Sequence, residues 1–266
     1  MTTWTLTDLE FKVLCDTRFF GLVPSMFSIT SRIPYMDDYE REWRRTRAEL
    51  ESRDDSAFEA IVDTMVLPEV LVGGEVWEDD DFDNPAKRVR FYAGRLGSRG
   101  FLVTQIPGET INHADGFRIT PIDPRALGDT VVRLMPPAEP GRRGPIEIDI
   151  SGGGRSSGGG SRGSTGSMVA DDDDDDGITS SVFLNIPADH CGTVRLTQGR
   201  SKFGPRGRIS VARLWRDLPG DGRYVMPLEE STPIAIGMGS AGLSDWIDTE
   251  AELILERMSD YREVEE

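Results

Sequence analysis

The sequence contains few of the residues on which catalytic and metal-binding sites most often depend. Its 266 residues include only two cysteines, Cys15 and Cys191, and two histidines, His113 and His190. Two cysteines are too few for a disulfide framework or for a zinc site made of four cysteines. We therefore expect a cytoplasmic chain with both thiols reduced, because stable disulfides are rare in that compartment.

Long apolar segments are absent as well. No run approaches the roughly 20 apolar residues of a transmembrane helix, and residues 1–8 lack the basic and apolar regions of a signal peptide. We expect neither membrane insertion nor a signal peptide. Hydrophobic residues nevertheless make up 37% of the chain and recur from Trp4 to Tyr261, so a core can be buried. A chain of this length forms one large domain or two small ones.

Positive charge is scarce relative to negative charge. The chain has 30 basic and 47 acidic residues, which gives a formal net charge of −17, and only three of the basic residues are lysines. A field of this sign repels nucleic acid and anionic membranes, so we expect no nucleic-acid partner. The acidity favours solubility. It also leaves open a function as an acidic decoy for a basic partner.

Apolar residues at helical spacing predict several amphipathic helices. One covers residues 37–51 and includes Trp43, and a second follows the capping-box pattern that starts at Ser56. A third begins at Asp123-Pro124 and includes Leu134, and a last helix is capped by Ser244. We expect Trp43 and Leu134 to be core residues, because each lies on the apolar stripe of its helix.

Other segments have the alternation of strands. About four strands are predicted between residues 70 and 122, one at 145–150, and about three between 208 and 237. Residues 4–20 fit a half-buried strand or a short helix. Strands in antiparallel runs, with helices grouped between them and at the C-terminus, indicate an α+β fold with a central antiparallel sheet. Both halves run from strands to a terminal helix, so an internal duplication is conceivable, although no residue-level repeat is visible.

A segment of low complexity interrupts this pattern. A Gly/Ser-rich stretch follows residue 150, and six consecutive aspartates occupy residues 171–176. Neither composition can bury apolar surface, so we expect a disordered insert over residues 151–177. The predicted organisation is an N-terminal half over residues 1–150 and a C-terminal half over residues 178–266, both belonging to a single domain.

The sequence has no motif of a known catalytic or metal site. It lacks a Gly-x-Ser-x-Gly elbow, a P-loop and a His-Glu-x-x-His pair. His190 and Cys191 are adjacent in the chain, and neighbours seldom point at each other, so they do not predict a dyad. The aspartate runs lack the turns of a calcium loop. We expect no catalytic, cofactor or metal residues. The alternative is a hydrolase that uses carboxylates far apart in sequence.

Several stretches, taken in order, resemble one protein family. They are Trp4-Thr-Leu-Thr-Asp-Leu-Glu-Phe11, Ile122-Asp-Pro-Arg-Ala-Leu127 followed by Val131-Val-Arg-Leu-Met-Pro136, Pro140-Gly-Arg-Arg-Gly144, Arg206-Gly-Arg-Ile-Ser-Val211 and Asp221-Gly-Arg-Tyr224. Together they are similar to the EspG family, the cytosolic chaperones of actinobacterial type VII (ESX) secretion. Residues 152–177 depart from the family pattern.

The resemblance implies an α+β fold in two pseudo-symmetric halves and a non-enzymatic role. A member of this family holds a secretion substrate, in mycobacteria a PE–PPE heterodimer, by the tip of its helical bundle and keeps it soluble for export. The family grips its substrate with the loop between the second and third strands and with a C-terminal helical part. By position these are residues 78–87 and the region around Trp246.

The loop at residues 78–87 also has the composition of an interface. It is longer than a hairpin needs, and it combines aromatic anchors with charged residues. The predicted partner-binding residues are Trp77, Asp79, Asp80, Asp81, Phe82 and Trp246. The alternative is that Trp77 ends a strand in the core and Phe82 folds back beneath its own loop.

Overall fold

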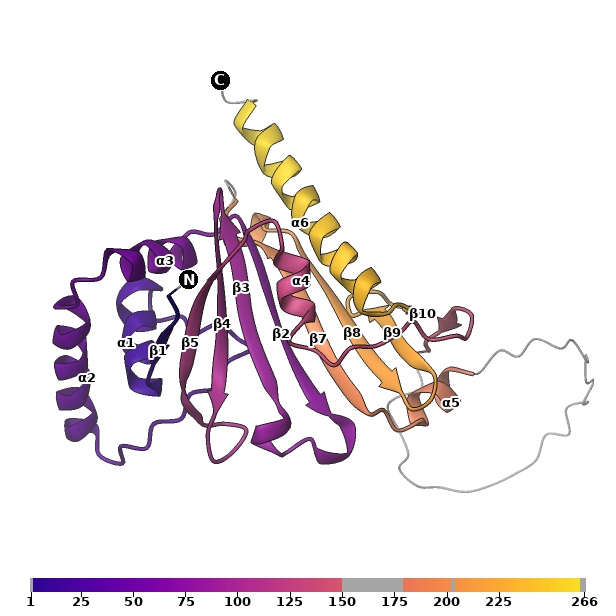
Figure 1. Cartoon of the computed structure of the whole chain (residues 1–266), viewed down its shortest axis with the longest axis horizontal. Coiled ribbons are helices and arrows are strands. Elements are labelled where there is room, and N and C mark those ends of the chain that lie inside the picture. Colours follow the sequence, from indigo (N-terminus) through magenta and orange to yellow (C-terminus); the bar gives the residue numbers. More distant parts are fainter. Residues whose placement is uncertain (1, 150–178, 202–203, 264–266) are drawn as a thin grey trace, which may run out of the picture.

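The computed structural model describes residues 2–149, 179–201 and 204–263 (Figure 1). The predicted insert, residues 151–177, lies outside the described residues. Within the described residues the strands form one antiparallel ten-stranded sheet in the order β1-β5-β4-β3-β2-β7-β8-β9-β10-β6. The strands are β1 Trp4–Leu6, β2 Val70–Glu78, β3 Val89–Leu96, β4 Arg99–Pro107, β5 Ala114–Ile122, β6 Ile146–Glu147, β7 His190–Gln198, β8 Ser210–Leu218, β9 Gly222–Pro227 and β10 Ile234–Gly237.

The strand order is that of two similar halves. In the first, β2 to β5 form a meander, and β1, which comes earlier in the chain, pairs with β5 at the edge. In the second, β7 to β10 form a meander, and the earlier β6 pairs with β10. The halves join through β2 and β7, from Val70 opposite Gln198 to Glu78 opposite His190. The predicted α+β fold in two pseudo-symmetric halves is confirmed. The boundary at residue 150 stays a prediction.

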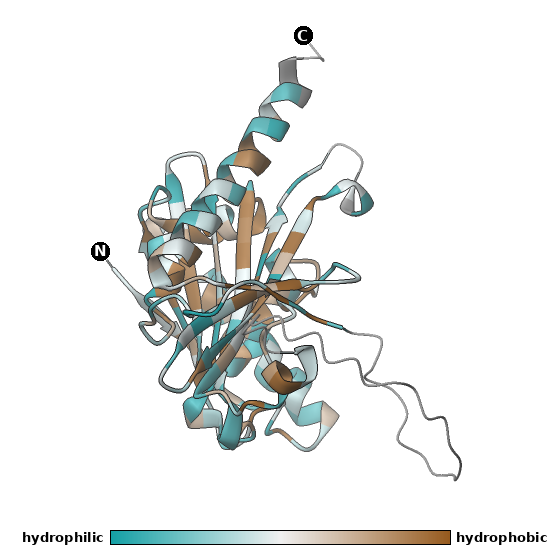
Figure 2. Cartoon of the chain, turned by 90° about the vertical axis from the view of Figure 1, so that its right-hand side faces the viewer, coloured by the Kyte–Doolittle hydropathy of each residue, from teal (hydrophilic) through white to brown (hydrophobic). Residues whose placement is uncertain are grey.

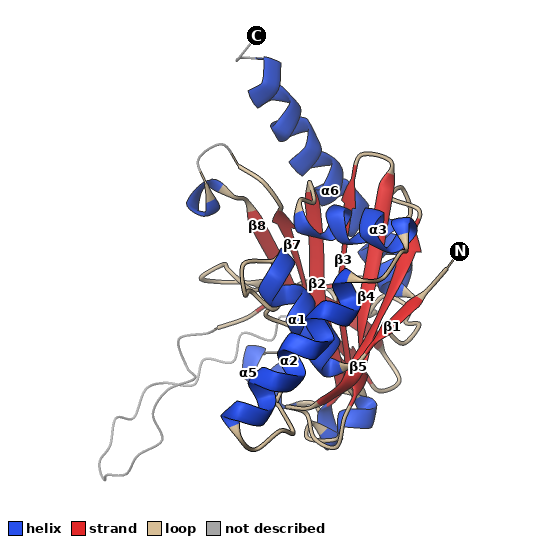
Figure 3. Cartoon of the chain, turned by 90° about the vertical axis from the view of Figure 1, so that its left-hand side faces the viewer, coloured by secondary structure: helices blue, strands red, loops and turns tan. Residues whose placement is uncertain are grey.

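Helices cover both faces of the sheet. Those in the described residues are α1 Asp8–Arg18, α2 Met36–Glu51, α3 Ser56–Val66, α4 Leu127–Val132, α5 Ser180–Asn185 and α6 Ser240–Glu263. Figure 3 shows α1, α2 and α3 in front of the strands of the first half. We call this side, which α5 also covers, the α1 face, and the side under α4 and α6 the α6 face. Val76 packs with the α4–α6 core and Trp77 with the α5 core, as alternation along a strand requires.

Each face carries its own core. On the α1 face of the first half, Phe11 stacks on Phe117 with ring centroids 3.9 Å apart, and Phe27 meets Phe117 edge-on at 5.0 Å. On the α6 face, the buried Trp215 on β8 lies in the same core as Leu243 and Ile247 of α6. Apolar residues are correspondingly concentrated along the strands (Figure 2). Burial of this apolar area is the main force that holds helices to sheet.

Local signals explain where the first helices start. The N-terminal segment contains both predicted structures, a three-residue strand and then α1. Thr7 accepts a hydrogen bond from the Glu10 N–H, and Glu10 accepts one from the Thr7 N–H, which is a capping box. The cap of α3 is Asp55, one residue before the predicted Ser56, and its Oδ1 accepts the N–H groups of Ala57 and Phe58.

The structure corrects two further predictions. α2 forms as predicted, but Thr46 is its only buried residue, and Trp43 is half-buried with its indole N–H 3.0 Å from Asp16 Oδ2. Leu134 is half-buried as well and follows the end of α4. α4 starts at Leu127, because Asp123 closes a turn by accepting the Arg125 and Ala126 N–H groups. An apolar stripe therefore overstated how deeply these helices are buried.

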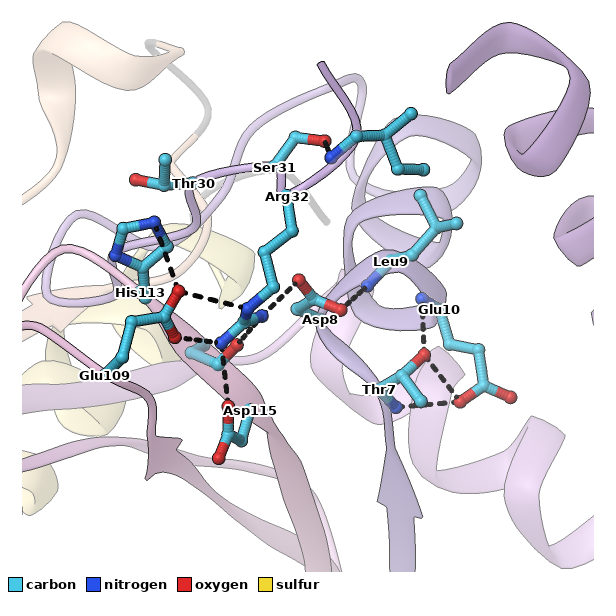
Figure 4. A network of polar contacts seen from close by, with 12 residues as sticks. Thr7, Asp8, Leu9, Glu10, Thr30, Ser31, Arg32, Glu109, His113 and Asp115 are labelled. Atoms are coloured by element: carbon cyan, nitrogen blue, oxygen red, sulfur yellow. Dashed lines mark hydrogen bonds and ion pairs between the residues drawn. The ribbon is translucent and has the colours of Figure 1, made fainter. Parts of the chain in front are cut away.

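A polar network holds the chain between α1 and α2 against the sheet (Figure 4). Arg32 donates to Asp8 Oδ2 at 3.0 Å, to Asp115 Oδ1 at 2.7 Å and to the Ala114 carbonyl at 2.8 Å. It also donates from Nε to Glu109 Oε1 at 3.2 Å, and this contact lowers the pKa of Glu109. The segment is thereby tied to the start of α1 and to the β4–β5 loop.

Candidate partner-binding site

The loop between β2 and β3 is compact and cross-linked. It contains two single-turn 3-10 helices, Asp79–Asp81 and Pro85–Lys87. Asn84 accepts the Ala86 N–H at 3.0 Å and donates to Asp81 Oδ2 at 2.9 Å. Lys87 forms ion pairs with Glu78 and, at 3.2 Å, with Asp81. The loop is longer than a hairpin needs because its extra residues form turns that are held by internal hydrogen bonds.

The charges of this loop stabilise one another. The hydrogen bond from Asn84, followed by that from Lys87, lowers the pKa of Asp81. Contacts with Glu78 and then Asp81 raise the pKa of Lys87. Asp81 and Lys87 both remain charged near neutral pH, so the loop presents this pair of opposite charges to the solvent.

The two predicted aromatic anchors lie against each other. The Trp77 and Phe82 rings meet edge-on with centroids 5.9 Å apart, and the Arg88 guanidinium lies 4.1 Å from the Phe82 centroid. Arg88 is buried and donates to the Phe82 carbonyl at 3.3 Å and to Glu75 at 3.3 Å. Phe82 is nevertheless 47% exposed. The ring thus folds back onto its own loop and still offers a face to the solvent.

Asp79 connects the loop to the second half of the molecule. Its Oδ2 accepts the Ala188 N–H at 3.0 Å and lies 3.7 Å from Arg216 Nη2. Arg216 is buried and donates to the carbonyls of Phe183 at 3.0 Å and Ile186 at 2.6 Å. The carboxylate of Asp79 therefore holds the β2–β3 loop beside α5, although Asp79 is exposed, as is Asp80 next to it.

α5 adds apolar surface that the sequence reasoning missed. Val182 and Leu184 are 52% and 42% exposed, although Phe183 between them is fully buried. Leu184 and Leu228 line one open cavity of about 700 Å³, together with Ile148, Leu214, Met226 and Pro233 among others. A helix of six residues carries too few turns to show a helical period in sequence.

The structure does not bring Trp246 to this loop. Trp246 lies on α6, where its indole N–H donates to Glu250 at 3.1 Å and its ring stacks against Arg213 at 5.2 Å. It packs on the α6-face core, whereas Trp77 packs on the opposite side of the sheet. Of the predicted partner-binding residues, Trp77 and residues 79–82 therefore lie together at the β2–β3 loop, and Trp246 lies apart from them on α6.

The side chains that could carry chemistry have structural roles. Cys15 and Cys191 are buried, and burial raises their thiol pKa values to about 12 and about 11, so neither is a ready nucleophile. His113 accepts from or donates to Thr110 at 2.8 Å at the edge of the Arg32 network. Asp248, whose pKa is raised by burial, accepts the Gly128 N–H at 2.8 Å. In the described part of the chain no cluster of three or more His, Cys, Asp and Glu could hold a metal ion.

These features are those of a protein that binds other proteins. A broad sheet offers a half-exposed aromatic in a charged loop and apolar side chains around an open cavity, which is the chemistry of a protein-binding surface. None of the helices in the described residues has the length and apolar character to span a membrane.

Comparison with known proteins identifies the family. The EspG family model matches residues 7–232, most of the chain, and the chain therefore belongs to the EspG family. Among solved structures, it is similar to the Mycobacterium tuberculosis type VII secretion system chaperone EspG5, determined in complex with the PE25–PPE41 dimer. The TM-score is 0.50 at 10% identity, with 96% of each chain covered, which shows a shared fold. Comparison with curated proteins gave no match.

Proposed function

We propose that this protein is a cytoplasmic, non-enzymatic chaperone that binds a helical type VII secretion substrate, a PE–PPE-like heterodimer, and keeps it soluble for export. One observation carries the proposal. The chain belongs to the EspG family and shares its fold, over 96% of both chains, with a chaperone whose solved structure contains such a heterodimer. A shared fold alone does not transfer function, but here the family match supports the same conclusion.

The β2–β3 loop is the proposed point of contact. Phe82 would anchor the substrate, because its ring is 47% exposed and held in place by Trp77 and Arg88. A pre-positioned aromatic loses little entropy on binding. Asp80 and Asp81 would form the polar rim, and Asp79 would hold the loop against α5. Trp246 would belong to a second contact, made by α6 on the other face.

We also propose that residues 1–150 and 178–266 are two halves of one EspG-like domain, with residues 151–177 as an insert. The continuous sheet supports this, since β2 and β7 pair along nine residues each. Such pairing joins the halves through backbone hydrogen bonds and a common core on the α6 face, so neither half is complete alone.

Co-expression tests the function. The chain would be produced together with a PE–PPE-like pair from the same host, and the pair would be produced alone as a comparison. We expect the pair to be soluble and to co-elute with the chain only in the first case, because the chaperone covers its apolar tip. A pair that stays soluble alone and never co-elutes would contradict the proposal.

Variants of the β2–β3 loop test the site. Phe82→Ala should weaken binding of the pair by about 5- to 30-fold, the range of ~1–2 kcal/mol for an interface anchor. Asp80→Asn with Asp81→Asn should have a smaller, salt-dependent effect. Phe20→Ala is the matched control, because Phe20 follows α1 and is 92% exposed. Equal affinity of all folded variants, measured by calorimetry, would exclude the loop as the site.

A further inference from the structure

The segment with seven basic residues between Cys191 and Arg216 contains no acidic residue, in a protein that is acidic as a whole. From Cys191 to Arg216 the sequence has seven basic residues and no Asp or Glu, although the whole chain carries a net charge of −17. The basic residues are Arg195, Arg200, Lys202, Arg206, Arg208, Arg213 and Arg216. Opposite charges are usually interspersed on a protein surface, so this separation calls for an explanation in the structure.

The segment forms the β7–β8 hairpin, and its strand arginines have partners within the protein. Arg216 donates to carbonyls of the α5 region, and Arg213 stacks on Trp246. Arg195 pairs with Glu229 at 2.5 Å and donates to Ser210 at 3.1 Å. Three of the positive charges are thus explained by folding.

The arginines at the end of the hairpin are different. Arg206 and Arg208 are exposed, and Arg206 lies in the 3-10 turn Pro205–Gly207. Arg200 is half-buried, and its Nε is buried without a hydrogen-bond acceptor, one of few such side-chain atoms in the described residues. A buried donor without an acceptor is costly. These three side chains form what we call the hairpin arginines. Residues 202–203 lie outside the described residues and are not included.

The hairpin arginines lie far from the proposed substrate loop. β7 runs antiparallel to β2, with His190 opposite Glu78 and Gln198 opposite Val70. The β7–β8 turn is therefore at the opposite end of the sheet from the β2–β3 loop, as Figure 1 shows. A strand of nine residues spans roughly 30 Å at ~3.3 Å per residue. Two ligands could occupy the two ends together.

We propose that the hairpin arginines are a docking surface for an acidic segment of a partner protein, separate from the substrate loop. Guanidinium groups match carboxylates in geometry and bind them through paired hydrogen bonds. A short acidic peptide feels mainly the local positive charge, because screening limits the repulsion from the rest of the chain to about 8–10 Å at physiological salt. A long nucleic acid would extend beyond this range and meet the acidic surface. The proposal does not depend on the identity of the secretion substrate.

Fluorescence anisotropy with a labelled peptide of alternating Glu and Ser, about ten residues long, tests the proposal at about 0.05 M and about 0.3 M salt. Three proteins are compared: the unchanged chain, Arg206→Glu with Arg208→Glu, and Arg41→Glu with Arg44→Glu. The last is a matched control, because Arg41 and Arg44 on α2 are 67% and 69% exposed and the change in net charge is the same. A peptide with Gln in place of Glu and a single-stranded oligonucleotide are the comparison ligands.

We expect the Glu peptide to bind the unchanged chain at low salt and the hairpin variant to bind it at least about tenfold more weakly. The α2 control should retain nearly full affinity, and the Gln peptide should not bind. Three results would overturn the proposal: no binding by the unchanged chain, equal losses in both variants, or tighter hairpin-dependent binding of the oligonucleotide. Light scattering on the free chain tests whether it self-associates through the hairpin arginines. Self-association that is lost in the hairpin variant would mean that a second copy of the chain is the partner.

Discussion

The two halves of the sheet share a strand order but are covered in different ways on the α1 face. The first half lies under three helices and a cluster of aromatic rings that includes Phe11, Phe27 and Phe117. In the second half the described cover is α5, six residues long, held by the buried Arg216. Apolar packing dominates the first arrangement, and hydrogen bonds from one guanidinium are central to the second.

This difference indicates that one half of the sheet mainly stabilises the fold, while the other half leaves surface for a partner. Burial of aromatic rings is worth several kcal/mol and stabilises the first half. The lighter cover of the second half leaves Val182, Leu184 and Leu228 partly exposed around an open cavity. Exposed apolar groups of this kind suit a partner surface. We therefore expect the first half to contribute more to stability and the second half to offer more exposed apolar surface to a partner.

The largest expected effect is in the first half. Phe11→Ala should lower the free energy of unfolding by about 3–5 kcal/mol, since it removes a fully buried ring that stacks on Phe117. Urea denaturation followed by tryptophan fluorescence measures it. Phe20→Ala, at a 92% exposed ring, is the control and should change stability by less than about 0.5 kcal/mol. Similar values for both variants would mean that the aromatic cluster is not what stabilises this half.

In the second half, we expect the loss of hydrogen bonds from Arg216 to lower the stability. Arg216→Met keeps most of the aliphatic volume but leaves the carbonyls of Phe183 and Ile186 without this donor, so we expect a loss of about 1–3 kcal/mol. Arg213→Met on the same strand removes only a half-exposed stacking contact and should cost under about 1 kcal/mol. Hydrogen exchange at residues 180–188 would show whether α5 detaches. Protection equal to that of the unchanged protein would contradict this role of Arg216.

A pH-dependent effect is expected where the halves meet on the α6 face. Burial, followed by nearby acidic groups, raises the pKa of Asp248, whose carboxylate accepts the Gly128 N–H of α4. A carboxyl group with a raised pKa favours the folded state in its protonated form, so its contribution is lost as pH rises through the folded pKa. Asp248→Asn keeps the acceptor and removes the charge. Its melting temperature relative to the unchanged protein should be higher at about pH 7 than at about pH 4; an offset independent of pH would disprove the assignment.

The smallest effect is expected from removal of the insert. The residues that flank it are already close, because the Asp149 N–H donates to Ser180 Oγ at 3.0 Å. Replacement of residues 152–177 by a short linker should therefore shift the melting temperature by only a few degrees, since loop-closure entropy depends weakly on length. Calorimetry on the purified variant measures the shift. Loss of soluble expression would show that the segment contributes to folding.

Local patterns predicted much of the fold. Alternating residues located β2 to β5 and β8 to β10, and apolar spacing located α2, α3 and α6, because these signals need only a few neighbouring residues. β7 was missed, since Gly192 and Gln198 on its buried face leave only Val194 and Leu196 as apolar residues of the alternation. Gly192 is needed there, because a Cβ would lie 2.4 Å from the Trp215 ring. That requirement comes from the neighbouring strand and has no local signal.

The candidate site was only partly predictable. Composition and loop length selected Trp77 and Phe82, and the structure shows that they contact each other. The same reasoning grouped Asp79 with Asp80, although Asp79 accepts a hydrogen bond from Ala188, 109 positions later. It also could not show that Arg88, buried beneath Phe82, supports the ring. Contacts between residues so distant in sequence leave no periodic pattern.

The order of residues alone was enough for the class of fold, most of its elements, and the absence of recognisable catalytic motifs, because propensity, alternation and motif spacing are local properties. Tertiary structure decided which residues are buried, which loops meet and which charges are neutralised. Trp43 is half-buried, on a helix whose single buried residue is Thr46, and Arg216 is buried because α5 folds over it. Burial and charge pairing depend on the whole arrangement of the chain in space. A sequence pattern reports only the contacts between residues that are close together in the chain.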